Sequence, residues 1–184
     1  MLAVPESEQE LSRQARVGVP EAWDALFKRY QLPLYVYVFE LVRDEQASLD
    51  LVQETFIAAV RHIGGLRDDA RFGGWLFGIA HQKCIQRWRK QGREYAALDE
   101  LSATPSEAEA DPSELLISRE QETEFLRLLE QLPVTHRSVL LLHYLEDFPL
   151  EEIASITGAS LGTVKSRLHY ARKALGNLLK ENVT

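Results

Sequence analysis

The side chains that most often carry out catalysis or bind metals are few in this chain and widely spaced. His81 and Cys84 have the spacing of two ligands on one helix, but a tetrahedral metal site needs four ligands, and no second pair accompanies them. His62, His136 and His143 are dispersed along the sequence. We therefore expect no enzyme activity, no metal site and no cofactor.

The basic residues are the more informative set, because they gather in two short stretches. Residues 83–93 hold five Lys or Arg residues and no acid, and residues 165–173 hold four and no acid. Residues 94–124 hold ten acidic residues and one basic residue, so this segment contributes −9 to a net charge of −7. Phosphate contacts need Lys and Arg, so this segregation favours a nucleic-acid partner although the chain as a whole is acidic.

Length and composition limit the class of protein. A chain of 184 residues with 45% hydrophobic residues is long enough for one mid-sized domain or two small ones. A single cysteine excludes a disulfide framework, and the acidic N-terminal segment lacks the features of a signal peptide. Apolar runs fall far short of the roughly 20 residues that cross a bilayer, so we expect a cytoplasmic protein without membrane insertion.

Apolar residues recur at spacings of three and four almost throughout, which predicts an all-α fold. Ser7 with Glu10 three residues later predicts a capping box. Gly18 followed by Pro20 is expected to end that first helix and begin a second, which continues through Leu41. Further helices are expected at about 46–63, 74–91, 119–131, 134–145, 150–157 and 161–179, with a Gly- and Asp-containing loop at 64–73.

Two small helical domains joined by a flexible acidic linker are the expected organisation. Residues 1–93 make the first domain and residues 119–184 the second. The intervening residues 94–118 are rich in Ala, Glu, Ser, Asp and Pro, which predicts a flexible, self-repelling segment. Fully extended, it reaches roughly 80–90 Å, enough to connect domains bound roughly 70 Å apart on DNA, two helical turns from each other.

Residues 149–179 have the layout of a helix-turn-helix. Leu150, Ile153 and Ala154 give the first helix an apolar face, and the Gly-Ala-Ser sequence at 158–160 supplies the turn and an N-cap. The expected buried stripe of the second helix is Leu161, Val164, Leu168, Ala171 and Leu175. The face expected to point outward and to fit a DNA major groove is Thr163, Lys165, Ser166, Arg167, His169, Tyr170 and Arg172.

Simpler interpretations of the polar surfaces stay open. A basic helix face is most often merely solvated, and the same holds for a polar stripe on the 46–63 helix. That stripe is Asp50, Gln53 and Glu54, and it is predicted to lie opposite Val52, Phe56 and Val60. Trp88 has the character of a stacking platform for an unpaired base, but its spacing from Ala80 and Cys84 favours a place in the core.

Two sequence blocks resemble one protein family. The block DLVQETF at 50–56, followed by FGGWLFGIA at 72–80, strongly resembles region 2 of the extracytoplasmic-function (ECF) sigma factors of bacterial RNA polymerase. The block GTVKSRLHYAR at 162–172 resembles the region 4 recognition helix of the same family. The blocks stand in the family's order with an acidic linker between them, so the similarity covers roughly residues 8–180.

The resemblance implies partners for these surfaces. The stripe of Asp50, Gln53 and Glu54 matches the surface that docks on the clamp helices of the polymerase β′ subunit. The second domain is implied to bind the minus-thirty-five promoter element through the seven outward residues of its recognition helix, and the β flap through its apolar helices. The resemblance also implies an anti-sigma factor that covers the polymerase-binding faces.

The resemblance further implies that the loop at 66–74 captures a flipped-out base of the minus-ten element and that the following helix holds the melted strand. Extruding a base costs a few kcal/mol of unstacking, which a shaped pocket must offset, so this loop is expected to set promoter choice. The residues implied to bind minus-ten DNA are Leu66, Arg67, Asp69, Arg71, Phe72, Trp75, Gln82, Lys83, Arg87, Arg89 and Lys90.

The chain departs from the family pattern at several positions. Gln82 and Gln86 stand where Asn and Asp are usual, which bears on strand melting. Gly73 and Gly74 replace aromatic or hydroxyl residues, which predicts an unusually flexible loop. Pro149 and Tyr170 replace a Ser and an Arg that are frequent in the family; the loss of the Arg predicts a shifted minus-thirty-five preference.

Two other functions fit part of the sequence. A sigma-like decoy would bind an anti-sigma factor without recognising promoters, but it would not need the basic residues retained on both helices. An ordinary helix-turn-helix regulator with an unrelated sensor domain is disfavoured by the region 2 resemblance. We therefore expect a sigma factor that binds core RNA polymerase and promoter DNA.

Overall fold

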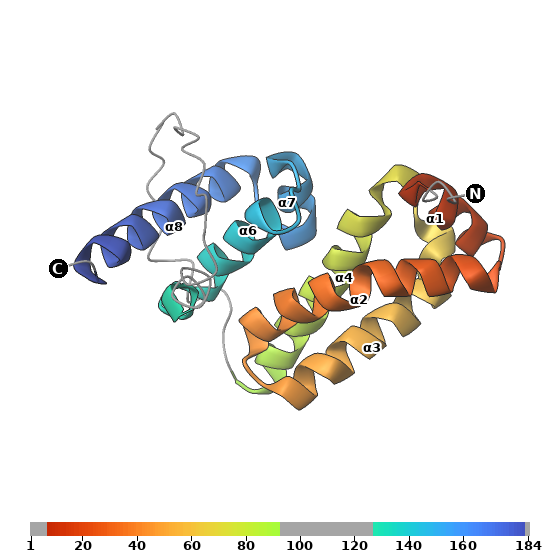
Figure 1. Ribbon diagram of the computed structural model, residues 1–184, viewed down its shortest axis with the longest axis horizontal. Coiled ribbons are helices and arrows are strands. Elements are labelled where there is room, and N and C mark those ends of the chain that lie inside the picture. The colour runs from red at the N-terminus through yellow and green to blue at the C-terminus, as the bar shows by residue number, and fades with distance from the viewer. Residues whose placement is uncertain (1–6, 93–126, 183–184) are drawn as a thin grey trace, which may run out of the picture.

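The computed structural model describes residues 7–92 and 127–182, and every regular element within those ranges is helical. The first group of elements is α1 (Glu8–Arg16), α2 (Pro20–Val42), α3 (Glu45–His62), the 3₁₀ turns η1 (Ile63–Gly65) and η2 (Asp69–Arg71), and α4 (Phe72–Lys90). The second group is α6 (Val134–Tyr144), α7 (Leu150–Thr157) and α8 (Leu161–Asn182) (Figure 1). The predicted all-α fold is confirmed, while the predicted linker at 94–118 lies outside the described residues.

Local signals in the sequence explain where the first helices begin and end. Ser7 Oγ accepts a hydrogen bond from Glu10 N at 3.2 Å and so caps α1 as predicted. Gly18 follows α1 with φ +88°, a conformation that favours glycine, and Pro20 is the first residue of α2. Asp44 caps α3 by accepting from Ala47 N at 2.8 Å.

The first group is a four-helix unit with a common core. Leu26, Leu34, Tyr37 and Phe77 are among its fully buried side chains, contributed by α2 and α4. Trp88 is 5% exposed, which confirms the prediction that it belongs to the core. The loop between α3 and α4 contains the two 3₁₀ turns, so the segment at 63–71 is compact and partly helical.

The second group has the predicted helix-turn-helix form. Gly158 ends α7 with φ +68°, and Ser160 Oγ accepts a hydrogen bond from Thr163 N at 3.1 Å at the start of α8. Val164, Leu168, Ala171 and Leu175 are buried as predicted. Leu161, the first residue of the predicted stripe, is only partly buried.

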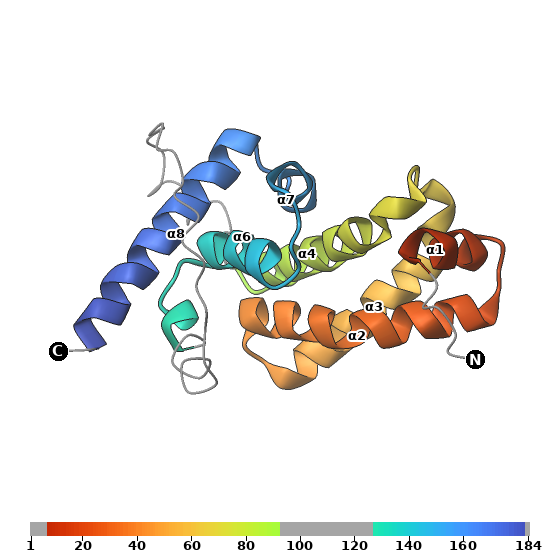
Figure 2. The ribbon, with the colours of Figure 1, turned by 45° about the horizontal axis from the view of Figure 1, so that its top comes forward.

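The two groups pack directly against each other. The contacts run between α4 and α7 and between α2 and α6 (Figures 1 and 2). Between the two groups, the ring of Phe148 meets the ring of Phe77 edge-on, with centroids 5.4 Å apart. Arg43, the residue after the end of α2, also forms an ion pair of 2.6 Å with Glu130, in the helical residues before α6.

Candidate nucleic-acid and polymerase interfaces

A groove of about 910 Å³ opens between the loop at 65–71, α4 and α7. Six of the residues predicted to bind minus-ten DNA line it: Leu66, Arg67, Arg71, Trp75, Gln82 and Lys83. Gln86, another departure from the family pattern, lies in the same wall, and α7 contributes Glu152, Ser155 and Ile156. The fold therefore gathers residues from a loop and a helix onto one concave surface.

Phe72 does not share this surface. Its ring is fully buried, with centroid distances of 6.2 Å to Trp23, 5.7 Å to Tyr30 and 5.8 Å to Trp75. Such edge-on and tilted ring contacts are the favourable ones in a core. In this arrangement Phe72 therefore anchors the start of α4 and does not reach the groove.

The basic half of α4 is partly neutralised by the neighbouring helix. Lys83 Nζ lies 3.2 Å from Glu54 Oε2, and Arg87 Nη2 lies 3.8 Å from Asp44 Oδ2. The remaining cations predicted to bind minus-ten DNA on this half, Arg89 and Lys90, are exposed. A residue predicted to bind polymerase, Glu54, is thus tied to one predicted to bind DNA, Lys83.

The polar stripe of α3 is exposed as predicted. Asp50, Gln53 and Glu54 all face solvent, and Asp50 Oδ1 accepts a hydrogen bond from Gln46 Nε2 at 3.1 Å. The prediction for the opposite face is only partly right: Val52 and Phe56 are buried, but Val60 is 52% exposed.

An apolar groove of about 920 Å³ lies beside this stripe, between α2 and α3. Gln53 lines it together with several large apolar side chains that are more than 40% exposed: Phe27, Leu32, Leu49, Ile57 and Val60. Clustered exposed apolar side chains mark interaction surfaces more often than scattered ones do. This groove was not predicted from the sequence, although the apolar residues Leu49 and Ile57, which fall outside the buried stripe of α3, are a signal for it.

The recognition helix α8 presents only part of its predicted outward face. Lys165 is exposed, and Thr163, Ser166, His169, Tyr170 and Arg172 are partly buried. Arg172 Nε donates a hydrogen bond to Tyr144 Oη of α6, and its guanidinium lies 5.3 Å from the centre of that ring. The partial burial of Arg172 therefore comes from contact with α6.

Arg167 overturns the prediction that this whole face points outward, because its side chain is 2% exposed. Burial, together with the positive charge of Arg167, lowers the pKa of His81 in α4 to about 4. Arg167 therefore lies close to the first group of helices. Helix periodicity alone does not reveal this burial, because α8 also packs against α6 and α7.

The start of α7 packs closely against the first turn of α4. A Cβ atom on Gly74 would overlap the Glu152 carboxylate and lie 2.9 Å from Glu152 Cγ, so the two helices approach closely at this glycine. Burial raises the pKa of Glu152, and Arg71 opposes that shift. Helix α7 of the second group therefore packs beside the α4 surface that is predicted to bind minus-ten DNA.

Comparison with known proteins identifies the family. Residues 26–94 match the family described as Sigma-70 region 2, and residues 122–175 match Sigma-70, region 4. The RNA polymerase sigma-H factor of Pseudomonas aeruginosa is 30% identical over 95% of each chain. The ECF RNA polymerase sigma-E factor of Escherichia coli is 31% identical over 93% of each chain.

This chain belongs to the ECF family of RNA polymerase sigma factors. The α1–α4 group contains its region 2, and the α6–α8 group its region 4. As an ECF sigma factor it serves core RNA polymerase in promoter-specific initiation, and members of the family are not enzymes themselves. The predicted family is therefore confirmed.

Two solved structures match this sigma factor over both regions. CnrH, solved in complex with the cytosolic domain of CnrY, matches with a TM-score of 0.69 and 26% identity, over 96% of this chain and 99% of CnrH. The sigma factor RpoE from Bartonella quintana, solved with the anti-sigma factor NepR, matches with a TM-score of 0.62 and 26% identity, over 84% of this chain and 96% of RpoE.

The ligand-like pair of α4 lies in the core of region 2. Both His81 and Cys84 are fully buried, and burial raises the pKa of the Cys84 thiol to about 12, so the thiolate that a metal requires is disfavoured. Tyr37 Oη lies 2.8 Å from His81 Nδ1. Within residues 7–92 and 127–182, no group of three or more metal-binding side chains is found, and no helix is long and apolar enough to span a membrane.

Proposed function

We propose that this ECF sigma factor docks on the β′ clamp helices through Asp50, Gln53 and Glu54. Their exposure on one face of α3, beside an apolar groove, supports this assignment. We assign residues 1–93 to the region 2 domain, 94–118 to a linker, and 119–184 to the region 4 domain, whose apolar helices bind the β flap. The protein acts in the cytoplasm and carries out no chemistry of its own.

We further propose that the groove between the loop, α4 and α7 receives the minus-ten element. The convergence of six predicted residues on that groove supports this assignment. Lys83, Arg87, Arg89 and Lys90 would then follow the phosphates of the melted strand along α4. Phe72 supports the groove from within the core, while Asp69 acts in holding the loop.

The minus-thirty-five element is assigned to α8, and this assignment requires the two regions to separate. Arg167 is buried in the described arrangement, whereas Lys165, the other cation of the predicted base-contacting pair, is exposed. Binding of α8 in a major groove needs the Arg167 side chain to become accessible as well. We infer that the described arrangement is a closed state, which core polymerase opens when it binds.

An anti-sigma factor is the proposed inhibitor. CnrH was solved with the cytosolic domain of CnrY, and RpoE with the anti-sigma factor NepR, and both resemble this chain over most of its length. By analogy, the inhibitor would cover the polymerase-binding surface of α3 and favour the closed state.

The observation that carries the proposal is the presence of both sigma regions, in order, with their predicted binding residues gathered on surfaces. The direct test is transcription in vitro with core polymerase and a promoter pool randomised at the minus-ten and minus-thirty-five segments. We expect initiation from a defined subset of sequences with preferences in both segments. Absence of both polymerase binding and initiation by the pure, inhibitor-free protein would contradict the assignment.

A further inference from the structure

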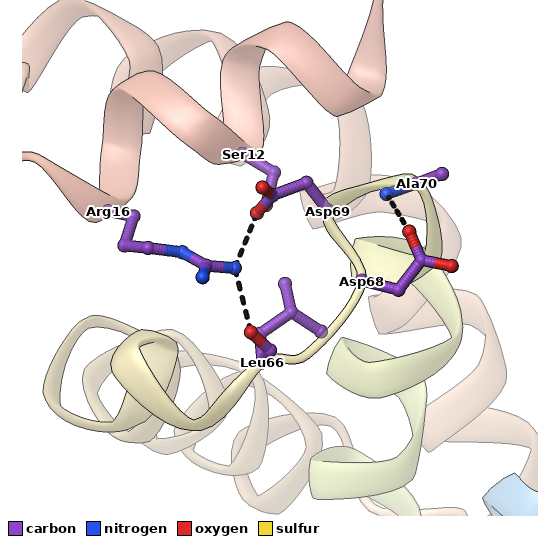
Figure 3. A network of polar contacts seen from close by, with 6 residues as sticks. All are labelled: Ser12, Arg16, Leu66, Asp68, Asp69 and Ala70. Atoms are coloured by element: carbon purple, nitrogen blue, oxygen red, sulfur yellow. Dashed lines mark hydrogen bonds and ion pairs between the residues drawn. The ribbon is translucent and has the colours of Figure 1, made fainter.

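The loop between α3 and α4 is fastened to α1 by a small polar network (Figure 3). Arg16 Nη2 donates one hydrogen bond to the backbone oxygen of Leu66 at 2.7 Å and another to Asp69 Oδ1 at 2.6 Å. Ser12 Oγ donates to the same Asp69 oxygen at 3.0 Å. One turn of α1 therefore holds both the beginning and the middle of the loop.

The side chains of this network are largely buried. Ser12 is fully buried, and the side chains of Arg16 and Asp69 are 32% and 21% exposed. Charge-assisted hydrogen bonds are stronger when they are partly removed from water, and here one guanidinium nitrogen serves two acceptors. The loop is therefore held in one position by contacts between residues that lie 50 and 53 positions apart in the sequence.

The opposite end of α1 holds the exit of the same loop. Glu8 Oε1 accepts a hydrogen bond from Gly73 N at 3.0 Å, and Glu8 also accepts from Tyr30 Oη. Burial, followed by the hydrogen bond with Glu8, raises the pKa of Tyr30, so this hydroxyl stays protonated and remains a donor. Helix α1 thus brackets the loop from Leu66 to Gly73.

Polar contacts inside the loop are local by comparison. Asp68 accepts from Ala70 N at 3.0 Å and forms a 3.6 Å ion pair with Arg71. These contacts shape the η2 turn but do not fix its position on the helical bundle. Of the described residues that line the groove beside the loop, none belongs to α1, so α1 acts on this surface from outside it.

We propose that α1 sets the minus-ten selectivity of this sigma factor, with Arg16 and Ser12 as positioning residues that act through Asp69 and the Leu66 carbonyl. The inference rests on the proposed function of the loop. Capture of an extruded base needs a pocket that is already shaped, because unstacking takes a few kcal/mol and a mobile loop would add an ordering cost. Residues 8–16 precede the segment that matches Sigma-70 region 2, so this role concerns a helix outside the matched segment.

The test uses full-length protein, core polymerase and a promoter pool randomised at both promoter segments. The variants are Arg16→Ala, Ser12→Ala and Arg16→Lys, with Arg13→Ala as the matched control. Arg13→Ala removes the same charge from the same helix, but Arg13 pairs with Glu10 of α1 itself and its side chain is 68% exposed. For Arg16→Ala we expect the strongest minus-ten base preference to fall by roughly ten-fold, the size expected for a charged hydrogen bond, with unchanged minus-thirty-five preferences.

The remaining variants separate positioning from other roles. Ser12→Ala should weaken the minus-ten preference less than Arg16→Ala does, because the ion pair remains. Arg16→Lys should recover part of the preference, and Arg13→Ala should match the wild type. A uniform loss of transcript with unchanged base preferences would overturn the proposal, because it would indicate a simple phosphate contact.

A failure of the proposed function would look different. In that case the wild-type protein itself would show no preference in the minus-ten segment. If the wild type is selective and Arg16→Ala keeps the same selectivity, the role of α1 is refuted while the loop assignment stands. If Arg16→Ala does not fold, Asp69→Asn removes the charge of the shared acceptor and is expected to produce the same selective loss.

Discussion

The packing of region 4 on region 2 predicts that loosening the interface will raise affinity for minus-thirty-five DNA. Phe148 lies in the loop before α7, and its ring meets Phe77 of α4 at a centroid distance of 5.4 Å. Phe77 is fully buried in region 2, whereas Phe148 is partly buried. Phe148→Ala therefore removes an interface contact and leaves the core side chains of α4 in place.

The burial of the Phe148 ring sets the expected loss of free energy in the closed state. Truncation of a fully buried Phe typically costs about 3–5 kcal/mol, and an aromatic pair contributes about 0.5–1.5 kcal/mol beyond its buried area. Because Phe148 is only partly buried, we expect the closed state to lose about 2 kcal/mol, which makes the open state about thirty times more populated relative to it. Since Arg167 is buried when the regions are packed, affinity for duplex DNA should rise by up to that factor.

Fluorescence anisotropy with a minus-thirty-five duplex, in the absence of polymerase, measures this change. Phe27→Ala is the matched control: Phe27 pairs with Phe56 at 4.8 Å and is 43% exposed, and it lies on the α2–α3 surface. Circular dichroism would verify that both variants are folded. Unchanged or weaker DNA binding by folded Phe148→Ala would refute the reasoning that interface packing limits access to α8.

Three further predictions address other surfaces. Asp50→Ala with Glu54→Ala should lower affinity for core polymerase in a competition assay, and normal holoenzyme assembly would contradict the clamp assignment. Lys165→Ala should weaken minus-thirty-five binding by about 1–3 kcal/mol if Lys165 contacts a base, whereas unchanged duplex affinity would exclude that contact. Burial and Arg167 hold the pKa of His81 at about 4, below its ordinary value of 6.5, so this group lowers stability as pH falls from 6.5 towards 4. In denaturant unfolding, the free energy of unfolding of His81→Gln should therefore fall by about 2 kcal/mol less than that of the wild type between pH 7 and pH 5. The variant must be compared with the wild type because burial raises the pKa of Glu146 to about 7, which changes stability in the opposite direction over this pH range. Equal losses would exclude a neutral, buried His81.

Local patterns in the sequence predict the helices well, because each carries its own signals. Ser7 and Asp44 cap α1 and α3, and the buried residues of α8 recur at spacings of three and four. The predicted helices at 134–145 and 150–157 agree with α6 and α7 to within one residue. These features depend on neighbours within one or two helical turns.

Features created by contacts between distant segments could not be predicted in the same way. Arg167 is a plausible outward residue by periodicity, yet its side chain is 2% exposed and its charge acts on His81 of region 2. The hydrogen bonds from Arg16 to the loop join residues 50 and 53 positions apart, and no motif signals such a pairing. A charged residue near the end of a helix is too common to indicate a specific partner.

The two glycines in the first turn of α4 were correctly noted as unusual, but the prediction that they make the loop flexible is wrong. Gly73 and Gly74 predicted a flexible loop, but both lie inside α4 and are buried. A Cβ on Gly73 would lie 2.7 Å from Tyr30 Oη, and one on Gly74 would overlap the Glu152 carboxylate. Their small size, and not their flexibility, is what the fold uses. The first glycine allows Tyr30 to reach Glu8 beneath the loop, while the second allows α7 to approach α4. Adjacent residues thus serve two separate functions, since one supports the minus-ten surface and the other the packing of region 4 on region 2.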